Sequence, residues 1–240
     1  MSIKLPLILT VSVLWLTACA QQPVLPAQLQ IIPPLSALAA EYVTTVSPHD
    51  EHDQEVTPSP QQWRFWRDAH FIETLNLADQ SGDNWAKATD GTVTYQRLFH
   101  EQKQLVDYLP GDLKAIGIAV DWTALATLIK PSLIAGLKAD DRVEVLGRSA
   151  IHYQSTDPEK PFELLWLEQE QLPALIKFTE HGHTVSTELT ALYPLAQSPW
   201  PYQRAAAYKS TDFSDLGDKE NDPFVKSIQH KLKGGHGHDH

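Results

Sequence analysis

The stretch from residue 162 to residue 190, FELLWLEQEQLPALIKFTEHGHTVSTELT, decides the fold. Its first segment carries apolar side chains at every second position, Phe162, Leu164 and Trp166, which is the period of a strand with one buried face. Pro173 ends this pattern, and a His-Gly-His turn separates two further alternating segments. Strands joined by short turns pair in antiparallel fashion. The stretch therefore predicts three neighbouring strands of an antiparallel sheet.

Working outward, the same signals recur on both sides of a helical region. Aromatic and β-branched residues from 63 to 77 predict one or two strands, and Asp90-Gly91 is a strong hairpin signal between two more. Pro110-Gly111 is expected to close this first group. Residues 142–154 alternate again, which predicts a half-buried strand with Gly147 as a bulge.

Between the two groups of strands, residues 121–137 have a helical period. Apolar residues recur every three or four positions, and Asp121 is a suitable N-cap. Pro131 interrupts the pattern, so we expect a break at Lys130 and a second short helix with Pro131 in its first turn.

The order strands, helices, strands predicts an α+β fold, with helices gathered on one face of an antiparallel sheet. We expect this domain to cover residues 63–200, followed by an acidic and His-rich tail at 201–240. Residues 19–62 are rich in proline and predict a tether. Within the tether, residues 35–46 fit a helix or a segment packed on the domain edge, and we interpret them as a semi-extended spacer.

The N-terminus carries a predicted export signal. Lys4 precedes an apolar run that ends in Leu16-Thr17-Ala18-Cys19, which predicts a signal peptide at residues 1–18. The run is too short for a spanning helix, which needs roughly 20 apolar residues. The sequence resembles the lipobox of bacterial lipoproteins, in which the cysteine is acylated, for example with palmitate, and becomes the mature N-terminus. The resemblance implies a lipid anchor on Cys19, and Ala20 implies the outer membrane, at its periplasmic face.

Composition excludes several classes of function. The chain of 240 residues has a formal net charge of −11, which argues against nucleic acid as a partner and against charge-driven docking on anionic membranes. Membrane attachment would then come from the acyl chains. Because Cys19 is the only cysteine, disulfides and thiolate zinc sites are excluded. The motifs Gly-x-Ser-x-Gly and His-Glu-x-x-His and phosphate-binding glycine loops are lacking, so we expect no enzyme.

A family resemblance follows from the strand pattern. Tyr153, then FELLWLE at residues 162–168 and Leu172-Pro173-Ala174, placed after a meander and a helical pair, resemble the lipoprotein-carrier (LolA-like) superfamily, which includes the RseB-like regulators. The resemblance implies a strongly curved antiparallel sheet, an unclosed half-barrel, with short helices packed on its concave apolar face. It also implies binding of acyl chains or sensing of lipidated proteins. We expect no required cofactor.

Six residues are candidates for lining an apolar-ligand site on such a sheet. They are Trp63, Tyr95, Trp122, Leu125, Phe162 and Trp166. The same side chains also fit an ordinary hydrophobic core, because a filled and an empty cavity need the same lining.

Two further hypotheses rest on the C-terminal residues. His236, His238 and His240 alternate on a flexible chain and suit Zn²⁺, Ni²⁺ or Cu²⁺, which predicts metal handling; a solvated tail is the alternative. A His- and Asp-rich run at 49–53 has a similar composition. The acidic segment 212–224 includes Phe213 and Phe224, which suggests either a protein-docking segment or one that packs back on the domain.

Overall fold

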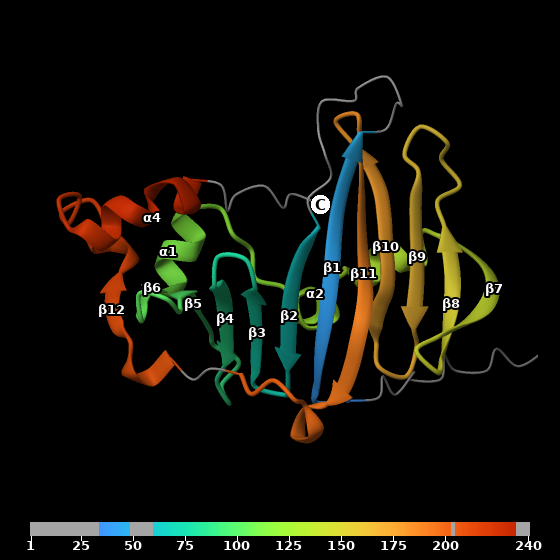
Figure 1. Cartoon of the computed structure of the whole chain (residues 1–240), viewed down its shortest axis with the longest axis horizontal. Helices are drawn as coiled ribbons and strands as arrows, with labels where there is room; N and C mark the ends of the chain where they lie inside the picture. The colour runs from blue at the N-terminus through green and yellow to red at the C-terminus, as the bar shows by residue number, and fades with distance from the viewer. Residues whose placement is uncertain (1–33, 49–59, 203–204, 234–240) are drawn as a thin grey trace, which may run out of the picture. The chain divides into compact units, whose positions relative to one another are not determined.

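The computed structural model describes residues 34–48, 60–202 and 205–233, with side chains up to residue 228. These residues form one 12-stranded sheet with short helices (Figure 1). The strands are β1 (Leu38–Pro48), β2 (Gln61–Arg67), β3 (Phe71–Asn76), β4 (Ser81–Lys87), β5 (Val93–Phe99), β6 (Gln104–Tyr108), β7 (Lys138–Val145), β8 (Arg148–Gln154), β9 (Phe162–Leu167), β10 (Leu172–Glu180), β11 (His183–Pro194) and β12 (Lys209–Asp212). The helices are α1 (Pro110–Ala115), α2 (Trp122–Thr127), α3 (Pro131–Ala135) and α4 (Pro223–Lys233), with 3-10 turns at Leu195–Gln197, Ala205–Ala207 and Phe213–Asp215.

Two antiparallel meanders meet in the middle of the sheet. The strand order is β12-β6-β5-β4-β3-β2-β1-β11-β10-β9-β8-β7, and only the pairing of β12 with β6 is parallel. The first strand of one meander, β1, pairs with the last strand of the other, β11, along its whole length from Leu38 opposite Pro194 to Pro48 opposite His183. The edges β12 and β7 stay apart, so the sheet is unclosed.

The helices lie on one face because the chain must cross the sheet. Strands β6 and β7 are consecutive in sequence but stand near opposite edges, so the connection carrying α1, α2 and α3 runs across a face. We call this the inner face; it carries Tyr42, Phe65 and Tyr95. Ala126 of α2 is buried in a cluster with Tyr42 and Phe65, and Leu113 of α1 is buried in a second cluster with Tyr95.

The opposite, outer face is covered by the segment after β11. Leu195, Trp200 and Tyr202 pack over the buried Trp66 and its neighbours, and the indole N–H of Trp66 donates to the Trp200 carbonyl at 2.9 Å. Ala205 and Tyr208 continue over β5 and β6, before the chain adds β12 beside β6. Finally α4 returns to the second inner cluster through Phe224, Val225 and Ile228.

One buried side chain, Arg67 at the end of β2, joins three separate segments. Its Nε donates to the Ser36 carbonyl before β1 at 3.2 Å and its Nη1 to the Gln171 carbonyl at 3.1 Å. The guanidinium also donates to the carbonyls of Ala126, near the end of α2, and of Glu170. Burial lowers the pKa of Arg67 to about 10, and Tyr42 and Glu170 partly oppose this, so the side chain remains a cation at neutral pH.

The predicted fold class is confirmed: a curved, unclosed antiparallel sheet with short helices on one face. The hairpin at Asp90-Gly91 forms, with Gly91 at φ +88° between β4 and β5. Asp121 caps α2 by accepting a hydrogen bond from the backbone N–H of Ala124 at 3.0 Å, and α3 begins at Pro131 as expected.

The folded region begins earlier and ends later than predicted. Residues 38–48, interpreted as tether, form the central strand β1, because Leu38, Ala40 and Tyr42 alternate onto the inner face and are buried there. Beyond residue 200, the expected tail supplies β12 and α4. Phe213 stacks on Tyr108 with ring centroids 4.5 Å apart, and Phe224 is buried, so the acidic segment packs back on the domain.

One local prediction was wrong, and another was confirmed with an added feature. Gly147 is not a bulge: it lies at φ +73° beside Leu146 at φ +52°, and this pair forms a two-residue hairpin turn between β7 and β8. Pro110-Gly111 closes the first group of strands as expected, since β6 ends at Tyr108. Pro110 also starts α1, because proline suits the first helical position and Asp112 accepts a hydrogen bond from the Leu109 backbone N–H at 2.8 Å.

We expect Arg67→Met to lower the free energy of unfolding by about 3 kcal/mol or more, because it leaves several buried carbonyls without a donor. Arg67→Lys should restore only part of this loss, since one ammonium cannot reach carbonyls on three sides. Urea unfolding monitored by tryptophan fluorescence measures both variants. The salt-bridged but more exposed Arg142→Met provides the control, and a loss below about 1 kcal/mol for Arg67→Met would contradict the role of Arg67.

Candidate functional site

Cross-strand rows of mostly apolar side chains extend over the inner face beyond α2. Residues directly opposite one another on paired strands point to the same side of the sheet. One row runs across β8, β9, β10, β11 and β1 through Tyr153, Leu164, Ile176, Thr187 and Thr44. A second runs beside it across β9, β10, β11 and β1 through Phe162, Phe178, Val185 and Val46. We call these two sets the apolar rows.

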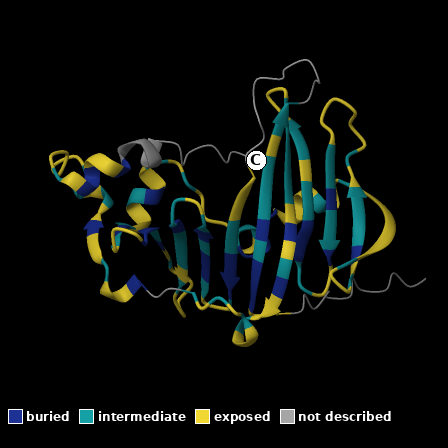
Figure 2. Cartoon of the chain, viewed as in Figure 1, coloured by how far each residue is buried: buried dark blue, intermediate teal, exposed yellow. Residues whose placement is uncertain are grey.

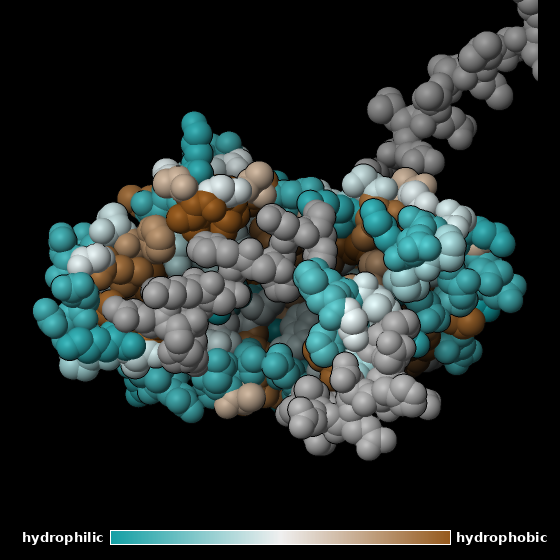
Figure 3. All heavy atoms as spheres, turned by 90° about the horizontal axis from the view of Figure 1, so that it is seen from above, coloured by the Kyte–Doolittle hydropathy of each residue, from teal (hydrophilic) through white to brown (hydrophobic). Residues whose placement is uncertain are grey.

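The apolar rows are only partly covered. Along β1 the residues pass from buried at Leu38–Ala40 to half-buried beyond Tyr42, and Val46 is 42% exposed. Figure 2 shows this change from dark blue to teal along the strand. Phe162 and Phe178 lie nearly parallel with centroids 6.4 Å apart, and both are half-buried. Seen from above, brown apolar residues reach the surface between hydrophilic ones (Figure 3).

A rigid network connects these rows to the core. Trp63 stacks on Tyr42 with centroids 4.6 Å apart, and its indole N–H donates to Thr44 Oγ1 at 3.0 Å. Thr44 and Thr187 share a hydrogen bond of 2.8 Å between β1 and β11. The buried hydroxyl of Tyr42 donates to the Pro173 carbonyl at 3.0 Å, at the bulge of β10. Strands β2, β1, β11 and β10 are thus held together beneath the apolar rows.

The connection from α2 to α3 lies beside the apolar rows, at the end nearest the cluster that contains Tyr42. Trp122 and Leu125 are half-buried and pack against the cluster that contains Tyr42. Leu128 ends α2 at φ +61°, a conformation that L-residues rarely adopt. The following helix α3 has no buried residue, and its Leu133 is 39% exposed. The α2–α3 connection therefore covers the inner face with partly exposed side chains rather than with a buried helix.

The second inner cluster contains a polar set among aromatic rings. Tyr95 stacks on Trp85 at 4.2 Å, and its hydroxyl donates to Asp83 at 2.5 Å. Burial, and next the charge of Asp83, raises the pKa of Tyr95 well above its ordinary value. The pKa of Arg97 is raised overall. Burial is the largest single effect and lowers it, but Asp83, Tyr95 and Tyr108 together outweigh burial.

The structure distributes the six predicted lining residues over three places. Trp63, Trp122 and Leu125 come together at the cluster around Tyr42. Phe162 and Trp166 lie on β9 outside that cluster, with Phe162 opposite Phe178 and Trp166 opposite Ile151 and Pro173. Tyr95 lies in the second cluster under α1 and α4.

Sequence reasoning missed the partners of these residues. Tyr42 was assigned to the tether, and Ile176, Phe178 and Val185 lie on strands whose alternation was recognised without a register. Only the pairing of β9, β10 and β11 shows that Phe162, Phe178 and Val185 stand side by side. The period-two pattern from 174 to 190 was the available signal.

Several predictions fall outside the described residues. Cys19, the run at 49–53 and His236, His238 and His240 are among them, so the lipid anchor and the metal site stay predictions. Within the described ranges, no group of three or more His, Cys, Asp or Glu side chains is placed to hold a metal ion. None of the helices in those ranges has the length and apolarity needed to cross a bilayer.

Comparison with known proteins finds similar structures only at low sequence identity. No family profile and no curated protein matches the sequence. Among solved structures, MucB is 16% identical with a TM-score of 0.37, over 72% of this chain and 59% of MucB. PNGF-II is 10% identical with a TM-score of 0.37, over 76% of this chain and 33% of PNGF-II.

A third similar structure is a domain described as an outer membrane lipoprotein-sorting protein from Vibrio parahaemolyticus. It is 8% identical with a TM-score of 0.29, over 72% of this chain and 90% of that domain. MucB was also matched in its complex with MucA. The chain spans less than two thirds of the length of MucB.

Tyr108 offers a test of the buried polar set. Burial chiefly raises its pKa to about 12, and Arg97 opposes this. Above about pH 10 the unfolded chain loses this proton while the folded protein keeps it, so stability falls as pH rises from about 10 to 12. We expect Tyr108→Phe to make this fall shallower in urea unfolding at stepped pH, without a change of secondary structure by circular dichroism. An equally steep fall in Tyr108→Phe would contradict the assignment.

Proposed function

We propose that this protein is a non-enzymatic bacterial envelope lipoprotein that binds an acyl chain or another apolar ligand on the inner face of its sheet, in a carrier or envelope-sensing role. The single observation that carries the proposal is the pair of apolar rows, which continue from the packed core onto a half-buried surface. A polar or fully buried inner face would leave no such surface for a ligand.

The energetics follow from the chemistry of the rows. An acyl chain laid along them buries methylene groups at about 0.8 kcal/mol each, so a handful of methylenes outweighs the ordering of one flexible chain. Phe162, Phe178 and Val185 would contact the ligand, while Trp63 and Tyr42 form the floor. Trp122 and Leu125 on α2, with α3 behind them, would act as plug or lid.

The place of action comes from the N-terminal sequence. The lipobox resemblance supports attachment through acylated Cys19 to the outer membrane, facing the periplasm. A carrier or sensor tethered there would meet lipids or lipidated proteins, which are partners of the proposed chemistry.

We expect Phe178→Glu to abolish binding of an apolar ligand, because it places a charge in the second apolar row. Thr179→Glu is the matched control: it is the next residue on β10, half-buried as well, and points to the other side of the sheet. Quenching of tryptophan fluorescence by a brominated fatty acid measures binding. Equal quenching in both folded variants would contradict the site.

We also expect Trp122→Asp or Leu125→Asp to abolish ligand uptake, because a carboxylate at the α2 contact would stay desolvated when the cover closes. Circular dichroism would establish folding, and native mass spectrometry of protein prepared from periplasm without detergent would show the ligand as a mass released on denaturation. Unchanged uptake in a folded Leu125→Asp variant would overturn the lid. A wild-type protein that never carries or takes up an apolar mass would overturn the function.

A further inference from the structure

A ladder of amide and carboxyl side chains crosses the outer face, opposite the apolar rows. Glu73, Asn84, Gln96 and Asp107 stand directly opposite one another on β3, β4, β5 and β6. Asn84 Nδ2 donates to Gln96 Oε1 at 3.3 Å, and Gln96 Nε2 donates to Asp107 Oδ1 at 2.6 Å. The ladder is continued by Ser210 of β12, whose hydroxyl donates to Asp107. Planar hydrogen-bonding groups are thus fixed in a line.

A cavity of about 390 Å³ opens over this ladder. Its polar wall is formed by Glu73, Asn84 and Gln96, and its other walls by Phe71, Ala86, Tyr202, Ala205 and Ala206. Phe71 and Tyr202 stack on each other with centroids 4.5 Å apart. The volume is that of a small-molecule site, and few polar groups converge in it beside aromatic rings.

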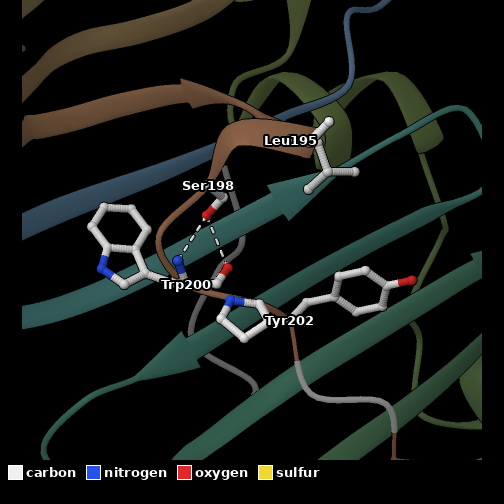
Figure 4. Close-up of a pocket in the computed structure, with 6 residues that line it drawn as sticks. Leu195, Ser198, Trp200 and Tyr202 are labelled. Atoms are coloured by element: carbon white, nitrogen blue, oxygen red, sulfur yellow. Dashed lines mark hydrogen bonds between the residues drawn. The ribbon is translucent and has the colours of Figure 1, made fainter.

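A second cavity of about 530 Å³ adjoins the first through Tyr202, which lines both. Leu195, Pro201 and Trp200 line it, and Ser198 fixes the turn by donating to the Trp200 carbonyl at 2.8 Å and accepting from the Trp200 backbone N–H at 3.1 Å (Figure 4). Arg64 lies over the Trp200 ring at 4.5 Å and pairs with Glu41 at 2.9 Å, which holds this ring in place. The two cavities meet at Tyr202, but the Trp200 ring points away from Tyr202 and lies at Arg64, so the groove beside the ladder is the first cavity, with Phe71 and Tyr202 as its aromatic wall.

We infer that this groove binds a short saccharide that carries N-acetyl groups. A pyranose ring presents an apolar face of C–H groups to an aromatic side chain and hydroxyls at its rim, which matches Tyr202 beside the ladder. Asn84 and Gln96 each keep one amide N–H beyond the bonds within the ladder, and Asn84 keeps its carbonyl oxygen. An acetamido group offers the complementary carbonyl and N–H. This site is independent of the apolar-ligand site, because it lies on the other face of the sheet.

The test uses the soluble protein from residue 20 onward and triacetylchitotriose as the probe, measured by titration calorimetry. We expect a dissociation constant of about 1 mM or lower, as befits an open groove. Ala206→Phe fills the first cavity and should abolish binding, whereas Ala207→Phe, at the next and equally exposed position outside the lining, should bind as the wild type does. Gln96→Leu should weaken binding by about tenfold through the lost hydrogen bond.

Cellotriose, which has the same linkage and hydroxyls in place of acetamido groups, separates the two parts of the inference. Weaker binding of cellotriose supports recognition by the amide ladder, and equal binding overturns it. No heat with triacetylchitotriose, or unchanged binding in a folded Ala206→Phe variant, would overturn the site. Fatty-acid binding should persist in Ala206→Phe, so a failure here leaves the inner-face function untouched.

Discussion

The position of α2 on the sheet depends on a single buried cation. All the hydrogen bonds that the structure shows from Arg67 go to backbone carbonyls and none to a carboxylate. These carbonyls lie before β1, at the end of α2 and in the turn from β9 to β10. The carboxylate of the nearby Glu170 forms its ion pair with Arg148 instead. Carbonyls at a helix C-terminus carry partial negative charge and favour a cation. The guanidinium therefore fixes α2 against the sheet near the cluster around Tyr42. Farther along the inner face, at the apolar rows, no helix is fixed in this way.

Topology explains why that far end stays partly open. The connection from β6 to β7 must pass beneath ten strand spacings of about 4.8 Å each, and it does so with three helices of six residues or fewer. Short helices cannot bury a whole sheet face, so they cover the middle and the β5–β6 end, where α4 joins them. The outer face is covered differently, by the extended segment after β11, which protects the apolar positions near Trp66 and leaves the polar ladder lining a cavity.

Local sequence patterns predicted those helices and strands that depend only on residues close in sequence. Asp121 and Pro131 placed two helices, and the alternation from 162 to 190 placed three strands, because caps and period depend on neighbours in sequence. They failed where a distant partner decides: residues 38–48 are flanked by prolines like a tether, yet their pairing with both β2 and β11 makes them the central strand. The site shares this limit. Phe162 could be singled out as aromatic on a strand, but only the register puts Phe178 and Val185 beside it.

The two faces acquire opposite chemistry from one rule of strand geometry. Neighbouring residues on a strand point to opposite sides, so each strand of the first meander carries one apolar and one polar or mixed series. Trp85 and Asn84 are adjacent on β4, as are Tyr95 and Gln96 on β5, and each pair divides between core and ladder. A one-residue slip of register would exchange the series and bury the ladder amides without partners. The Asn84–Gln96–Asp107 bonds disfavour such a slip, so the ladder that shapes the outer groove also holds in register the strands that form the inner core.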